Sequence, residues 1–399
     1  MRAILDPPTR TGSSSQPAAV EGTPRAGRRR LRRVAAFAVL TLLAASLGHD
    51  TGPARFTLEA VAFSQLQGWA DDRLAAAIPA FLRSCDRVLT LPDAAPLDAK
   101  PYAADYGQVG AWRELCEAAS TVPPEDDAAT RRFFETSFVP LSVNDYDASE
   151  GLFTGYYEIE LNGSRRRQGR YQTPIYRRPP DLNEAARYSR AEIEDGALYG
   201  RGLELLWVDD PIDAFFLEIQ GSGRVRLRNG GTMRVGYDGQ NGLPYVPVGR
   251  LLVERGIIPR STATMMTIRE WMNEHPEAGA ALRRENPSYV FFRELRGDGP
   301  IGAEGVVLTA ERSLAVDRAF IALGIPIWVE AEERFASADP VRRLVVAQDI
   351  GGAIKGPVRG DLFWGTGSAA AWRAGAMNAR GRYYLLLPRE VARRLSAAK

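Results

Sequence analysis

The sequence has few of the side chains on which most nucleophilic and metal-assisted enzymes depend. Its 399 residues include two histidines and two cysteines. A serine or cysteine nucleophile activated by histidine is therefore not expected, and neither is a zinc site built from these residue types. The chain contains no phosphate-binding loop of the Gly-x-x-x-x-Gly-Lys-Ser/Thr kind, and the run from Gly221 to Gly223 departs from the dinucleotide fingerprint. These absences leave carboxylates for the chemistry, with no cofactor and no metal expected.

Charge also excludes some partners. The formal net charge is +2, so the composition indicates neither nucleic acid nor an anionic membrane surface as a partner. The length of the chain and its 45% content of hydrophobic residues are sufficient for a sizeable core. Two domains are the natural expectation at this length.

Basic residues cluster near the amino terminus, directly before an apolar run. Arg25–Arg33 holds this cluster, and the run that follows, 34–47, is interrupted only by Thr41 and Ser46. This pattern is typical of a secretory signal or a short N-terminal anchor, and the run is short for a membrane span. Residues 1–54 are therefore predicted to comprise a disordered start and a signal or anchor segment.

The two cysteines are Cys85 and Cys116. If the chain is exported, a disulfide between them is expected. It would join a helix near Asp71–Asp86 to another near Gly110–Ala119. The alternative is a pair of buried free thiols. Neither cysteine follows the apolar run, so the sequence has no lipobox cysteine for acylation.

Hydrophobic spacing predicts helices first and strands later. Helices are expected at 69–86, 110–119 and 128–137. After Phe138, short apolar segments alternate with Gly, Pro and Asn, which predicts a strand-rich barrel or sandwich. The first strands are expected at Leu152–Ile159, Leu203–Val208, Ala214–Ile219, Val225–Leu227 and Met233–Tyr237.

Two helices and a second set of strands are expected further along the chain. One helix covers Val246–Arg255, and Ser261-Thr262 would cap the next, which runs to about Glu274. A third helix is expected at Ala315–Leu323, among the later strands. These strands are Val306–Leu308, Ile325–Val329, Leu344–Ala347, Leu362–Trp364 and Tyr383–Leu387.

The stretch between Ala347 and Gly365 is the most informative part of the sequence. It holds Asp349 and Asp361, separated by glycines and a proline, with an apolar run on either side. We read it as strand, tight glycine turns, and strand. Such a hairpin would hold two carboxylates on a rigid frame beside one cleft.

Several motifs, taken in order, resemble the membrane-bound lytic murein transglycosylase A family. The resemblance covers roughly residues 60–390. The motifs are Gly151-Leu-Phe-Thr-Gly-Tyr-Tyr-Glu158, Gln172-Thr-Pro-Ile-Tyr-Arg177, Phe216-Leu-Glu-Ile-Gln-Gly-Ser-Gly-Arg224, Val235-Gly-Tyr-Asp-Gly-Gln-Asn241, Ser313-Leu-Ala-Val-Asp317 and the stretch from Gln348 to Gly365.

This resemblance implies a mainly β fold with α (α+β). A double-psi β-barrel domain with N-terminal helices would comprise 55–153 and 291–399, and a smaller inserted β-barrel domain would comprise 154–290. The implied reaction cleaves the β-1,4 bond between N-acetylmuramic acid and N-acetylglucosamine in peptidoglycan. The muramyl 6-hydroxyl closes onto C1 and leaves a 1,6-anhydro end.

The family's three characteristic aspartates match Asp317, Asp349 and Asp361. An intramolecular hydroxyl acts at a very high effective concentration, so one acid can replace the two carboxylates of ordinary glycosidases. The resemblance assigns that role to Asp361, whose pKa must be raised by burial or a neighbouring negative charge. Asp349 would supply that charge, orient backbone amides or stabilise the glycine turn, and Asp317 is expected to be structural at a helix start.

Substrate contacts are expected from residues of the upstream motifs. Aromatic rings stack on sugar faces, and residues at strand ends offer hydrogen bonds to acetamido groups. Lys355 is either a donor to the glycan or an aspartate, or a solvated lysine, and Trp364 is either a sugar platform or a core residue. The candidates from the motifs are Thr154, Gly155, Tyr156, Gln220 and Ser222.

Two other functions remain open from the sequence. A hydrolase that uses water would need a second acid across the groove, such as Glu158 or Asp238, and would leave reducing ends. A non-catalytic glycan-binding protein would not depend on Asp361.

The expected partners are peptidoglycan strands, with cell-wall complexes possible in addition, and the protein is expected to be a monomer. It would lie in the periplasm of a Gram-negative envelope, soluble or held by an uncleaved N-terminal segment.

Overall fold

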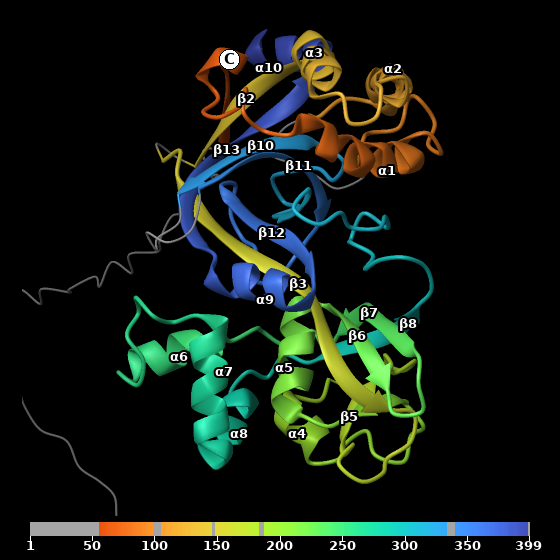
Figure 1. Cartoon of the computed structure of the whole chain (residues 1–399), viewed down its shortest axis with the longest axis vertical. Helices are drawn as coiled ribbons and strands as arrows, with labels where there is room; N and C mark the ends of the chain where they lie inside the picture. Colours follow the sequence, from red (N-terminus) through yellow and green to blue (C-terminus); the bar gives the residue numbers. More distant parts are fainter. Residues whose placement is uncertain (1–55, 99–104, 146–147, 183–186, 333–339, 398–399) are drawn as a thin grey trace, which may run out of the picture. The chain divides into compact units, whose positions relative to one another are not determined.

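The computed structural model describes residues 56–98, 105–145, 148–182, 187–332 and 340–397 (Figure 1). The predicted signal or anchor segment lies outside these ranges. Within them, no helix combines the length and the apolar character needed to cross a membrane. The fold is mixed α/β and mostly sheet, which confirms the predicted fold class.

The N-terminal part folds as three helices, as predicted, although the first begins at Ile78 and not at residue 69. A 3-10 turn at Leu74–Ala77 leads into α1 (Ile78–Val88), where Pro79 occupies the first turn and so costs no helical hydrogen bond. Two further helices follow, α2 (Val109–Ser120) and α3 (Asp127–Ser137). The predicted disulfide is confirmed, because Cys85 of α1 and Cys116 of α2 are bonded.

Six strands form a closed ring. Its order is β3–β13–β10–β11–β9–β12, and β12 pairs with β3 to close it. The β11–β9 and β12–β3 pairs are parallel, and the others in the ring are antiparallel. Closure leaves no free edges among these strands. They are β3 (Gly151–Ser164), β9 (Ser313–Val316), β10 (Pro326–Glu332), β11 (Val341–Asp349), β12 (Arg359–Thr366) and β13 (Asn378–Pro388).

Further elements extend this ring. Beyond Gly381, β13 pairs with β2 (Phe138–Asp145), which in turn pairs with β1 (Phe56–Ala60). Helix α9 (Gly367–Ala376) follows β12 directly, and α10 (Arg389–Ala397) follows β13. The strands of the ring are rich in fully buried residues, so the ring encloses core rather than a channel.

A second sheet grows from the other half of β3. The carboxyl half of this strand leaves the ring and pairs with β5 and β6, and Figure 1 draws it as one continuous strand. The order is β4–β5–β3–β6–β7–β8. The strands added are β4 (Thr173–Tyr176), β5 (Glu204–Val208), β6 (Ser222–Leu227), β7 (Thr232–Gln240) and β8 (Val290–Leu295).

Five helices accompany the second sheet. They are α4 (Arg190–Glu194), α5 (Pro211–Gln220), α6 (Val248–Glu254), α7 (Met265–Glu274) and α8 (Pro276–Arg284). Because β3 runs unbroken from one sheet into the other, its pairing does not mark a domain boundary. The division at residues 153 and 154 therefore stays a prediction.

Several predicted elements were wrong, and local signals explain why. The predicted strand Ala214–Ile219 lies in α5, whose N-cap Asp210 accepts hydrogen bonds from the amides of Ile212 and Asp213. Pro211 then fits the first turn, and Gly221 ends the helix with a φ of 77°. An apolar run alone does not distinguish a buried helix from a strand.

One further error concerns a helix cap, and two concern elements that do not form as predicted. Helix α7 is capped by Thr264, whose side chain accepts from the Thr267 amide, rather than by Ser261-Thr262. The predicted helix at Ala315–Leu323 begins as strand β9 and continues as turns. The predicted strand Val306–Leu308 forms only an isolated bridge between Ile301 and Val307.

Candidate active site

The two aspartates of the glycine-rich stretch face each other across a third strand. The predicted hairpin does not form, because β9 lies between β11 and β12. Asp349 and Asp361 are both register partners of Ala315 on that strand. With strands about 4.8 Å apart, their Cα atoms are separated by about 10 Å. Ala315 itself is buried in a small apolar cluster with Tyr156 and Phe363.

A bulge in β11 sets the direction of Asp349. The register shifts between Ala347 and Asp349, so that Gln348 is the extra residue. Such a bulge re-aims the side chains that follow it. Asp361 needs no bulge, because it pairs in register with Ala315 on one side and with Thr154 of β3 on the other.

Asp361 has one hydrogen-bonded oxygen. The Thr154 hydroxyl donates to Oδ1 at 2.6 Å, and Nη2 of Arg359 donates to the Thr154 oxygen at 2.8 Å. No donor among the described residues reaches Oδ2. Burial raises the pKa of Asp361 above its ordinary value, against the opposing effects of the Arg359 charge and the Thr154 hydrogen bond. The carboxyl is nonetheless partly exposed, so a ligand can reach it.

Asp349 has both oxygens occupied. Its Oδ1 accepts from the backbone amides of Ala303 and Ile350, each at 2.9 Å. The Tyr156 hydroxyl donates to Oδ2, also at 2.9 Å. Burial raises the pKa of Asp349 to about 6; these three hydrogen bonds oppose that rise, and the Asp361 charge adds to it. The two carboxyls therefore differ mainly in how many of their lone pairs are free.

A buried polar network supports Asp349 from behind. Gln348 is fully buried, and its Nε2 donates to the Ala80 carbonyl at 2.8 Å and to the Ser84 hydroxyl at 2.9 Å. Its Oε1 accepts from Ser313 at 2.6 Å, and its carbonyl accepts from the Glu304 amide. The network thus connects α1 to the loop that donates to Asp349. A glutamine at the end of an apolar strand is the one signal in the sequence that could have indicated this network.

Asp317 holds the loop between the other two aspartates. It follows β9 directly, not a helix start as predicted. Its Oδ2 accepts from the Gly356 amide at 2.8 Å and its Oδ1 from the Ala319 amide at 3.1 Å. Gly356 lies in the segment that joins β11 to β12. The contact supports the structural role predicted for Asp317, which stays a prediction.

Two predicted contact residues lie at the junction of α5 and β6, and both are buried. Gln220 is the last residue of α5 rather than the end of a strand, and its Oε1 accepts from the Tyr157 amide at 2.9 Å. Its Nε2 lies 3.4 Å from the sulfur of Met265. Ser222 begins β6 and is buried. The bond from Gln220 joins the end of α5 to β3 beside Tyr156.

Three further residues take positions that the sequence left open. Gly155 is required by close packing, because a Cβ there would lie 2.5 Å from the ring nitrogen of Trp364. That tryptophan is buried in the core, with the guanidiniums of Arg343 and Arg373 within 5.4 Å of its ring centre. Lys355 is exposed.

The acids considered for a two-carboxylate mechanism lie elsewhere. Glu158 is fully buried, and its Oε1 is 2.8 Å from Nε of Arg234. It lies four residues beyond Thr154 on β3, about 13 Å along the strand. Asp238 lies at a bulge in β7. Within the described ranges, no cluster of three or more His, Cys, Asp or Glu is arranged to hold a metal ion.

Comparison with known proteins agrees with this arrangement. Residues 152–293 match the MltA specific insert domain, and residues 312–387 match the 3D domain. The membrane-bound lytic murein transglycosylase A of Vibrio cholerae is 33% identical over 295 residues, which cover 72% of this chain and 76% of the relative. The chain belongs to the membrane-bound lytic murein transglycosylase A family.

Other members of this family give the same result. The Escherichia coli K12 enzyme of that name is 36% identical over 241 residues, and the matched part covers 59% of this chain and 65% of the relative's length. Among solved structures, a membrane-bound lytic murein transglycosylase from Agrobacterium tumefaciens has a TM-score of 0.75 at 34% identity, covering 85% of this chain and 99% of its own. E. coli MltA with bound chitohexaose has a TM-score of 0.59 at 28% identity, covering 84% and 95%.

Proposed function

We propose that this family member is a lytic transglycosylase that cleaves the β-1,4 bond between N-acetylmuramic acid and N-acetylglucosamine. In this proposal Asp361 is the single acid and base. The observation that carries it is the asymmetry of the two carboxyls. Asp361 keeps one oxygen free of protein donors, whereas Asp349 accepts three hydrogen bonds. The structure of E. coli MltA with bound chitohexaose supports a glycan as the ligand.

The raised pKa of Asp361 fits the first half of the reaction. Because burial raises the pKa of Asp361, its carboxyl holds its proton to a higher pH, and that proton can pass to the glycosidic oxygen as the bond to C1 breaks. The resulting carboxylate then accepts the proton of the muramyl 6-hydroxyl while O6 bonds to C1. The product is the 1,6-anhydro ring, and no water is consumed. Thr154 holds the carboxyl in place through Oδ1 during both steps.

Asp349 has a different role in this scheme. Its three hydrogen bonds fix the Ala303 and Ile350 amides and the Tyr156 hydroxyl beside the site. Burial, not the charge of Asp349, is the main cause of the raised pKa of Asp361. Asp349 therefore orients the walls of the site, which is one of the roles predicted for it.

Digestion of purified peptidoglycan sacculi tests this function. Mass spectrometry of the products distinguishes anhydro-muropeptides from hydrated ones. We expect anhydro ends from the wild-type protein, and their loss with Asp361→Asn and Asp361→Ala. Asp238→Asn is the matched control, because the two-carboxylate alternative requires a second acid and the single-acid mechanism does not. Hydrated ends, or full activity of Asp361→Asn, would rule out the proposal.

Export to the periplasm belongs to the same proposal. The basic and apolar pattern of residues 1–54 supports it, and so does the disulfide between Cys85 and Cys116, which forms in oxidising compartments. Cell fractionation followed by N-terminal sequencing tests it. Recovery of the protein in the cytoplasm would contradict the proposal.

A further inference from the structure

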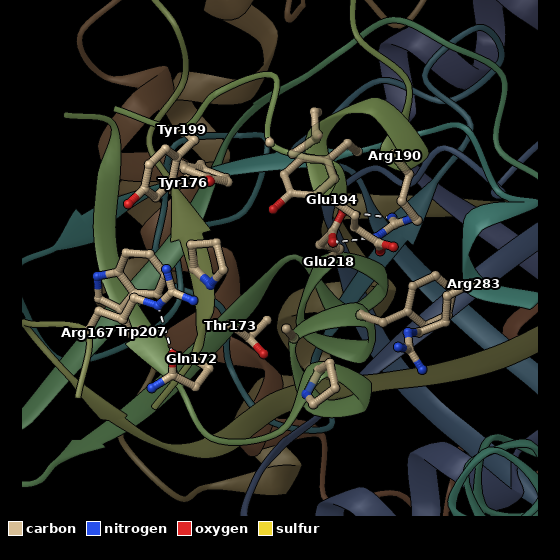
Figure 2. Close-up of a pocket in the computed structure, with 17 residues that line it drawn as sticks. Arg167, Gln172, Thr173, Tyr176, Arg190, Glu194, Tyr199, Trp207, Glu218 and Arg283 are labelled. Carbon is tan, nitrogen blue, oxygen red and sulfur yellow. Dashed lines mark hydrogen bonds and ion pairs between the residues drawn. The ribbon is translucent and has the colours of Figure 1, made fainter. Parts of the chain in front are cut away.

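A pocket of about 330 Å³ opens in the second sheet, and none of the three aspartates lines it (Figure 2). Its walls come from β4, β5, α4, α5 and α8. Aromatic side chains form much of the lining, including Tyr176, Tyr199, Trp207 and Tyr289. Tyr199 is 68% exposed at the rim, whereas Tyr176 and Tyr289 are buried. Pockets with aromatic walls and a few charged groups are typical ligand sites.

One charged pair in this pocket is already satisfied. Arg190 donates to both oxygens of Glu218, at 2.8 and 2.9 Å, and also to the carbonyls of Asn286 and Ser288. Figure 2 shows the pair joined by dashed lines. These contacts use the donors of Arg190 on the protein itself. The pair is therefore part of the wall rather than a free binding group.

Arg283 differs from Arg190 because no hydrogen bond or close ion pair holds it, although the charge of Glu194 acts on it from further away. It is 8% exposed and lines the pocket. Its guanidinium forms no hydrogen bond or ion pair with any residue that the structure describes, and no dashed line reaches it in Figure 2. Its neighbour Arg284, by contrast, forms two hydrogen bonds with Asp195. Burial lowers the pKa of Arg283, and the charge of Glu194 offsets this only in part, so an incoming anion would gain from direct hydrogen bonds to its guanidinium.

A negative group lies on the same lining. The Glu194 side chain is 31% exposed, and it lies 4.0 Å from Arg190 and 3.9 Å from Arg284. Both distances are too long for a hydrogen bond, so its oxygens can still accept from a ligand. The pocket thus offers a cation, an anion and aromatic walls. This combination matches a ligand that carries carboxylate, amino and small apolar groups together, as a short peptide does.

We propose that this pocket binds the peptide stem of the murein strand, with a stem carboxylate on Arg283 and a stem amino group near Glu194. The proposal rests on the proposed function, which brings a peptide-bearing glycan to the protein. Helix α5 connects the two places, since Glu218 lines the pocket and Gln220 bonds the Tyr157 amide next to Tyr156. Tyr245 gives a second connection. Burial is the main cause of the raised pKa of its hydroxyl, and the charges of Arg190 in the pocket and Asp361 in the active site both act on that pKa as well.

Calorimetric titration with the free tetrapeptide L-Ala-D-Glu-diaminopimelate-D-Ala tests binding without any cleavage. We expect wild-type protein and Arg250→Gln, a change at an exposed position of α6 away from the pocket, to bind it equally. Arg283→Gln should bind it about tenfold more weakly, the usual scale for a lost charge-assisted hydrogen bond. Tyr199→Ala, at an exposed position, keeps the test valid if Arg283→Gln fails to fold, and should also weaken binding. Absence of binding to the wild type, or equal affinity for the peptide with amidated carboxyls, would overturn the proposal.

Cleavage of two substrates then separates this inference from the proposed function. With peptide-bearing strands, Arg283→Gln should show a raised KM, and with strands stripped of peptide its kinetics should match the wild type. Equal losses on both substrates would refute a stem-specific role. If even the wild-type protein released no anhydro products, the proposed function would be wrong. The tetrapeptide titration would still show whether the pocket binds a peptide.

Discussion

Replacing Tyr156 with phenylalanine should raise the pKa of Asp349 and narrow the pH range of activity. The Tyr156 hydroxyl donates to Oδ2 of Asp349 at 2.9 Å and stabilises the ionised carboxylate. Without this donor the ionised carboxylate of Asp349 is less stable relative to the protonated form, so the pKa of Asp349 rises. A hydrogen bond to a charged group contributes about 1.5–3 kcal/mol. At about 1.36 kcal/mol for each pH unit, the pKa of Asp349 should rise by about 1 to 2 from its value of about 6.

The expected effect on the pH profile follows from the proposed division of roles. Asp349 must be ionised to accept its three hydrogen bonds, so activity falls when the pH drops below its pKa. The acidic limb of the profile should therefore move upward in Tyr156→Phe. Because the two carboxyls interact, the limb reports the pair rather than one residue. The rate of anhydro-muropeptide release, followed across the acidic and neutral range, gives the profile.

Tyr157→Phe is the matched control for this experiment. Tyr157 is the next residue on β3 and has the same 7% exposure as Tyr156. Successive residues of a strand point to opposite faces, and burial and the Arg269 charge are what act on the pKa of the Tyr157 hydroxyl. Its variant should keep the wild-type acidic limb. An unmoved limb in Tyr156→Phe, or an equal movement in both variants, would refute this reasoning.

Three further outcomes are expected. Asp361→Asn should be inactive, yet its free energy of unfolding should exceed that of the wild type at neutral pH and equal it at low pH. The reason is that a carboxyl with a raised pKa destabilises the fold when it ionises as the pH rises. Thermal unfolding at several pH values measures this difference. In the double variant Cys85→Ala/Cys116→Ala, the free energy of unfolding measured in urea should fall by about 3–4 kcal/mol, since the disulfide spans a sequence separation of 31. Reductant should not change the stability of this variant. Gln348→Leu should lower the free energy of unfolding by about 3 kcal/mol, because it removes three buried side-chain hydrogen bonds. A decrease below about 1 kcal/mol would contradict a stabilising role of this network.

The sequence predicted elements well where one local signal dominated. The helices 110–119 and 128–137 and the later strands around β10, β11 and β13 were placed correctly, because each has a clear period or a long apolar run. The Ala214–Ile219 segment failed because its apolar run fits a helix and a strand equally well. Its Asp210-Pro211 start and its Gly221 stop carried the deciding information.

The candidate site divides in the same way. The sequence singled out Asp349, Asp361, Thr154 and Tyr156, and the structure brings all four together on β3, β11 and β12. It did not single out Arg359, whose guanidinium holds Thr154. Nor did it indicate Arg283, since the absence of a hydrogen bond to its guanidinium is a property of the surroundings and not of the residue.

By itself, the sequence determined which chemistry is available and where it lies along the chain. Scarce histidine and cysteine left carboxylates, and the glycine-rich stretch marked two of them. Only the tertiary structure decided how these two differ. The stretch reads as a hairpin, but pairing with β9 and a bulge at Gln348 separate the aspartates and give them unequal partners. Strand order and hydrogen-bond partners depend on residues distant in sequence, so no local pattern encodes them.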